Sequence, residues 1–137
     1  MNRRTVREQT FKLLFGAEFH DLSEMDEQTR FFFEEESEEH AVSEPEVQER
    51  LSSILELLPD IDMDLENAIT GWGRDRIGKV ELAILRLAVY EMKYDDRVPE
   101  AVAINEAVEL AKKYGQDGAG SFVNGVLSKL LTHPDEK

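Results

Sequence analysis

The segment from Val80 to Tyr94 constrains the fold of this chain more than any other part of it. Its apolar residues recur on nearly every side of a helix: Leu82, Ile84, Leu85, Leu87, Ala88, Val89 and Met92. A helix that is apolar all round is normally buried by other elements. The longest apolar runs, such as residues 82–85, hold four residues, whereas a membrane-spanning helix needs roughly 20. The segment therefore predicts the central helix of a bundle and excludes an integral membrane protein.

Apolar residues at three- and four-residue steps recur on both sides of this segment, the spacing of amphipathic helices. The capping-box pattern Ser43-Glu44-Pro45-Glu46 predicts a helix start, Pro59-Asp60 predicts a break, and Gly115 predicts a helix end. A length of 137 residues fits one domain. We predict an all-α fold of about seven helices with no internal repeat, running through residues 6–22, 28–39, 43–58, 61–69, 80–94, 99–114 and 122–130.

Charge is distributed very unevenly along the chain. The formal net charge is -14, and residues 21–66 hold 17 acidic residues against only Arg30 and Arg50. Residues 1–20 are net basic because Arg3, Arg4 and Arg7 lie there. This asymmetry predicts a small anion-binding end on a chain that otherwise repels polyanions. The alternative is that the three arginines are ordinary solvated charge.

No pattern in the chain indicates catalysis, a metal or a cofactor. There is no cysteine, and His20, His40 and His133 have no metal-ligand spacing. The acidic residues at 60, 62 and 64 lack the glycine and glutamate of a calcium loop, and the glycine-rich stretches 71–73 and 115–120 follow no strand. We expect a non-enzymatic protein without a cofactor. The N-terminus does not resemble a secretory signal, so the cytoplasm is the expected location, and the absence of cysteine is compatible with it.

Two asparagines interrupt apolar helical stretches, Asn105 and Asn124. The favoured interpretation is that these amides are buried and hydrogen-bonded between helices and loops, since buried polar groups are normally satisfied internally. Contact with a ligand is the alternative. By periodicity alone, Phe15 and Phe122 are interpreted as core residues rather than as stacking platforms.

Several of these stretches together resemble the NusB family of transcription antitermination proteins. The resemblance rests on Arg3-Arg4-Thr5-Val6-Arg7-Glu8, on the central segment 84–92, on Val98 to Lys112, and on Phe122-Val123-Asn124-Gly125-Val126-Leu127. It covers nearly the whole chain and is thin between residues 20 and 60. It implies one helical domain, residues 1–137, with an N-terminal subdomain of about residues 1–75 and a C-terminal subdomain of about residues 76–137.

The resemblance also implies a binding function. Proteins of this family pair with NusE, a ribosomal small-subunit protein, and the pair binds boxA-type single-stranded RNA. The RNA polymerase antitermination complex that they join promotes transcription of ribosomal RNA operons. The resemblance leaves both a monomer and a homodimer open.

Carried over by position, the family's RNA-binding residues fall on Arg3, Arg4, Arg7, Phe15, Asp117, Gly118 and Phe122. Guanidinium groups suit this role because they bind phosphate bidentately and stack on bases. The family commonly has an acidic residue where this chain has Gly118, and Asp117 is the substitute that we expect. The family's partner surface assigns Glu81 to NusE, with an exposed helix-surface charge as the alternative.

Three arginines and a large negative charge predict weak binding to RNA by the chain alone, because affinity grows with the number of phosphates neutralised. NusE would then supply much of the affinity. The alternative function is a non-enzymatic helical interaction module that docks a basic partner without significant RNA binding.

Overall fold

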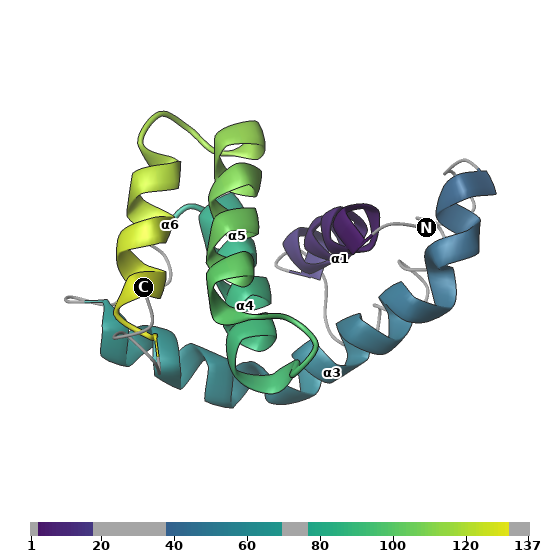
Figure 1. The fold of residues 1–137 in the computed structure, drawn as a ribbon, viewed down its shortest axis with the longest axis horizontal. Coiled ribbons are helices and arrows are strands. Elements are labelled where there is room, and N and C mark those ends of the chain that lie inside the picture. Colours follow the sequence, from purple (N-terminus) through teal and green to yellow (C-terminus); the bar gives the residue numbers. More distant parts are fainter. Residues whose placement is uncertain (1–2, 18–37, 70–76, 132–137) are drawn as a thin grey trace. The chain divides into compact units, whose positions relative to one another are not determined.

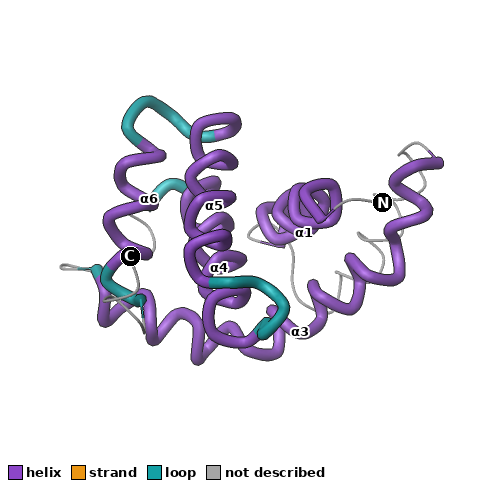
Figure 2. Tube along the Cα trace, in the orientation of Figure 1, coloured by secondary structure: helices purple, strands orange, loops and turns teal. Residues whose placement is uncertain are grey.

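The computed structural model describes residues 3–17, 38–69 and 77–131, with side chains in the second range described from residue 45. Five helices lie in these ranges: α1 (Arg3–Ala17), α3 (Glu38–Ala68), α4 (Lys79–Tyr94), α5 (Glu100–Tyr114) and α6 (Ala119–Ser128). Figure 1 shows them as a ribbon, and Figure 2 shows that loops alone join α4 to α5 and α5 to α6. The all-α class is confirmed.

The predicted number of about seven helices is wrong for the part of the chain that the structure describes, which has five. Two predicted helices, 43–58 and 61–69, are one 31-residue helix, α3, which begins at Glu38 rather than at the capping-box pattern. The predicted short helix at 28–39 lies almost wholly outside the described residues, as do the end of the first predicted helix and the glycines at 71 and 73.

Helix α3 continues through Pro59 because buried apolar residues recur at helical spacing on both sides of this proline. The buried positions follow steps of four and three residues, with Leu58 half-buried between them: Val47, Leu51, Ile54, Ile61, Leu65 and Ala68. An interior proline costs about 3 kcal/mol, while each fully buried large aliphatic side chain contributes about 1.5–3 kcal/mol. Pro45 and Pro59 are both exposed, so neither ring interrupts the buried stripe.

The chain divides into two compact units, Met1–Leu57 and Leu58–Lys137. The subdomain boundary expected near residue 75 lies outside the described residues and stays a prediction. In the first unit, α1 buries the predicted apolar residues Val6, Phe11 and Leu14, together with Leu13. Three polar side chains of α1 are buried as well, and the Thr10 hydroxyl donates to the Val6 carbonyl at 2.8 Å.

In the second unit, α4 is the buried central helix that the sequence predicted. Every residue from Leu82 to Met92 is buried, and α4, α5 and α6 contact one another pairwise. Pro99 precedes the first residue of α5, as expected for a proline at a helix start. Val102 differs from the prediction, because it is exposed on α5 instead of contributing to the core.

Polar contacts attach the end of α3 to this bundle. The buried Arg86 of α4 donates from Nε and Nη2 to the two carboxylate oxygens of Asp62, at 3.0 and 2.9 Å. The Lys129 ammonium donates to the Ala68 carbonyl at 3.2 Å, where a cation opposes the negative end of the helix dipole. Tyr94 stacks on Tyr90, and burial, followed by the charges of Asp64 and Asp60, raises the pKa of Tyr94 above 10.0.

Candidate nucleic-acid interface

The first turn of α1 carries exposed positive charge at the positive end of a helix. Arg3 and Arg4 are exposed, and the turn contains no acidic residue. Helix N-termini have unpaired backbone N–H groups and favour anions. Two guanidinium groups at this end repel the dipole, and a bound phosphate would relieve that repulsion. The local structure therefore suits an anion.

Two further predicted residues on α1 are less accessible than Arg3 and Arg4. The Arg7 residue is 5% exposed, so its guanidinium is largely covered in this structure. Phe15 is half-buried, which places it between a core residue and an exposed stacking platform. Among the described arginines of α1, the exposed charge therefore comes from Arg3 and Arg4.

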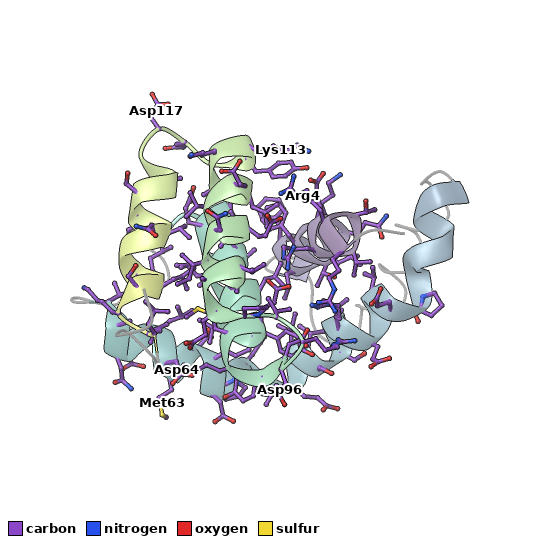
Figure 3. All side chains as sticks on the ribbon, viewed as in Figure 1. Arg4, Met63, Asp64, Asp96, Lys113 and Asp117 are labelled. Carbon is purple, nitrogen blue, oxygen red and sulfur yellow. The ribbon has the colours of Figure 1, made fainter. Side chains whose placement is uncertain are left out.

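The turn between α5 and α6 carries the other predicted residues. Gly118 has φ +87° and precedes the first residue of α6, a left-handed conformation that glycine adopts without steric cost. The Ala119 N–H donates to the Gln116 carbonyl and the Phe122 N–H to the Gly118 carbonyl, both at 3.0 Å. Asp117 extends from this turn away from the helices (Figure 3). The chain therefore has glycine where the family commonly has an acidic residue, and the backbone conformation at this position favours glycine.

Phe122 is 38% exposed on the first half of α6, so its interpretation as a core residue from periodicity is wrong. An exposed aromatic ring beside a polar turn provides a surface on which a splayed base can stack.

Two lysines that the sequence interpretation missed lie at the adjacent end of α5. Lys112 and Lys113 are exposed directly before Tyr114 and Gly115. The Lys113 ammonium lies 5.2 Å from the centroid of the Tyr114 ring, and Lys112 pairs with Glu109 at 3.6 Å. Their position immediately before a predicted binding loop was the signal that could have identified them.

Glu81 is half-buried in the first turn of α4. Its carboxylate lies against Gly78, which precedes α4, and against Gly115, which follows α5. The side chain is therefore packed at a junction of helices, with part of its surface still open to solvent.

Asn105 and Asn124 are exposed, so the favoured interpretation that their amides are buried is wrong. Both line an open groove of about 1030 Å³ between α5 and α6, with Val102, Val108 and Leu131 among its apolar lining. On α6 the buried residues are Ala119, Val123, Val126 and Leu127, so Asn124 lies outside the buried set of its helix.

The predicted site residues belong to two different units. Arg3, Arg4, Arg7 and Phe15 belong to the first unit, and Glu81, Asp117, Gly118 and Phe122 to the second. Within the second unit, the contacts of Gly115 bring the Glu81 carboxylate to the turn that contains Asp117 and Gly118. Within the described ranges, no three side chains group as metal ligands, and no helix is long and apolar enough to cross a membrane.

Comparison with known proteins gives consistent matches over nearly the whole chain. The model of the NusB family matches residues 4–132. The chain is 50% identical to the transcription antitermination protein NusB of Lachnoclostridium phytofermentans, over 96% of this chain and 99% of that protein. It is 48% identical to the protein of the same name from Agathobacter rectalis, over 95% of this chain and 99% of the relative.

Solved structures of NusB proteins are also similar to this chain over most of its length. NusB from T. maritima aligns with a TM-score of 0.80 and 33% identity, over 95% of this chain and 90% of that one. A chain from a complex of antitermination factors NusB and NusE with double-stranded RNA aligns with a TM-score of 0.75 and 25% identity, over 93% of this chain and 94% of that one.

Proposed function

The chain belongs to the NusB family, and we propose that it is a transcription antitermination factor that binds boxA-type single-stranded RNA together with NusE. Its role in this proposal is binding, not catalysis. The RNA is nascent ribosomal RNA, and the assembly is the RNA polymerase antitermination complex, which places the protein in the cytoplasm.

The observation that carries the proposal is the pair of exposed arginines at the N-terminus of α1. Helix termini of this kind normally carry acidic residues, because cations there oppose the helix dipole by about 0.3–1 kcal/mol each. Arg3 and Arg4 stand there with no acidic residue in the turn. Binding of RNA phosphates would offset the unfavourable placement of two cations at the positive end of the helix.

The turn from Gly115 to Gly118 and the exposed ring of Phe122 support a second contact with RNA. Single-stranded RNA is bound through bases stacked on aromatic rings and through its phosphates. Lys112 and Lys113 add positive charge next to this turn. The solved complex of a similar chain with NusE and RNA supports NusE as the partner, and Glu81 is the proposed contact for a basic NusE side chain.

The test is fluorescence anisotropy of a labelled boxA-type RNA, titrated with the chain alone and with the chain plus NusE, at two salt concentrations. We expect NusE to tighten binding. Replacing Arg3 and Arg4 by glutamate should abolish binding at physiological salt. At lower salt, where binding is measurable, the substitutions should reduce the slope of log affinity against log salt concentration by about 0.7 for each lost single-strand phosphate contact.

The control is Lys93→Gln, which removes a half-buried charge from the last turn of α4 and should leave the slope unchanged. If NusE is captured but no RNA binds under any condition, the proposal is wrong, and the chain is instead a module that docks a basic protein.

A further inference from the structure

Three helices meet at Gly115 with no space for a side chain. A Cβ atom placed there would lie 2.7 Å from the Ala111 carbonyl oxygen of α5, 2.7 Å from the Ala119 Cβ of α6 and 2.8 Å from Oε2 of Glu81 on α4. The Gly115 N–H also donates to the Ala111 carbonyl at 2.8 Å. Gly115, which follows α5, thus lies close against the beginnings of both other helices.

The Glu81 carboxylate fills the α4 side of this junction. Its Oε1 atom occupies the space beside Gly78, which precedes α4, while Oε2 faces Gly115. Glu81 lies in the first turn of α4, where the helix dipole favours a carboxylate. The two oxygens therefore lie in a favourable field, each against a different backbone segment.

We infer that Glu81 is a positioning residue for the turn between α5 and α6, in addition to any contact that it makes with a protein partner. Gly115 begins the segment that leads through Asp117 and Gly118 to α6, so the carboxylate packed against it fixes where that turn starts. The inference rests on the proposed function, because it concerns RNA binding by this turn.

Because Glu81 packs against this turn and is also the proposed contact for the protein partner, binding of RNA and binding of the partner should affect each other. Glu81 is half-buried and so reachable from solvent. A cation of the partner that attracts its carboxylate acts on the same group that supports the RNA-binding turn. Any such effect is reciprocal by thermodynamic linkage, so RNA should change partner affinity by the same factor.

The experiment compares Glu81→Ala and Glu81→Gln with the control Glu66→Gln, which removes an exposed charge from α3 in the same unit. RNA affinity is measured on the full chain without NusE at low salt, so that partner binding plays no part. Backbone amide NMR signals of residues 115–122 report the turn directly, and thermal melting monitors folding.

Glu81→Ala should weaken RNA binding by about fivefold or more and shift the amide signals of the turn, while thermal melting still shows a folded protein. Glu81→Gln, which preserves the shape, should remain close to wild type, as should Glu66→Gln. Wild-type affinity and unchanged amide signals in Glu81→Ala would overturn the inference and leave Glu81 as a simple surface charge. If the wild-type chain binds no RNA with or without NusE, the proposed function fails, and the amide signals alone decide whether Glu81 positions the turn.

Discussion

At the scale of single residues, Gly115 and Gly118 are both glycines for different reasons. Gly118 has a positive φ and open space around it, whereas Gly115 has φ -90° and no space. The sequence predicted Gly115 as a helix end but gave no sign that packing requires it, because the contacts come from α4 and α6. A hydrophobic pattern along the chain does not show which helices meet at one residue.

Replacing Gly115 by alanine should destabilise the protein by about 1–3 kcal/mol, the usual effect of overpacking. The new methyl group would meet the Ala111 carbonyl oxygen and the Ala119 Cβ. Neither of these atoms can rotate away. Urea unfolding followed by circular dichroism measures the change.

Gly125→Ala is the matched control. Gly125 lies within α6, and a methyl group added to it would have nothing within 4 Å, so alanine should stabilise the helix by about 0.5–1 kcal/mol. Equal effects at the two positions would show that helix propensity, and not the junction, governs Gly115.

Accessibility was the residue property that the sequence predicted least well. Arg7 is buried although it was expected to bind RNA, and Asn105, Asn124 and Phe122 are exposed although periodicity placed them inside. Periodicity identifies the centre of a helix's buried face. The width of that face depends on how many neighbours the helix has, and this is a property of the tertiary structure.

At the scale of elements, the sequence predicted each helix of the bundle of α4, α5 and α6, although α6 begins at Ala119 and not at Phe122. Each of these helices has a proline or glycine at one or both ends and a compact apolar pattern between them. The prediction failed at α3, where proline and a capping-box pattern were taken as boundaries. The unbroken four-and-three spacing from Val47 to Ala68 was present in the sequence, and it outweighs both local signals.

The ion pair between Arg86 and Asp62 joins α4 to the second half of α3, and periodicity could not have paired them. Asp62→Asn would remove the negative charge that faces the buried Arg86 guanidinium, at a cost of about 1.5–3 kcal/mol. Asp60→Asn, an exposed change close to the same contact in sequence, should stay within about 0.5 kcal/mol of wild type. Thermal and urea unfolding of both variants test this. A small effect of Asp62→Asn would mean that the pair adds little to the attachment of α3.

At the scale of the whole molecule, RNA binding opposes the chain's own charge. The net charge is -14, and residues 21–66 hold 17 of the 30 acidic residues. Local arginines attract phosphates at short range, whereas the acidic surface repels the RNA over distances on the order of the Debye length, about 10 Å at 0.1 M salt. The two effects respond differently to salt, so they can be separated.

Neutralising three exposed acidic residues of α3 tests this competition. Glu46, Glu49 and Glu56 are all exposed, and each removed charge weakens repulsion by about 0.2 kcal/mol for a separation on the order of 20 Å in water. At about 0.01 M salt the Debye length is about 30 Å and screening roughly halves this energy, so the triple glutamine variant should bind boxA-type RNA about 1.7-fold more tightly than wild type. At about 0.5 M salt the difference should disappear, because screening then removes long-range repulsion.

Ser52→Glu adds a charge to an exposed position on the same helix and should change affinity in the opposite direction at low salt. If the triple variant gains affinity equally at both salt concentrations, the acidic residues act through direct contact with the RNA, and long-range repulsion is not what weakens binding by the chain alone.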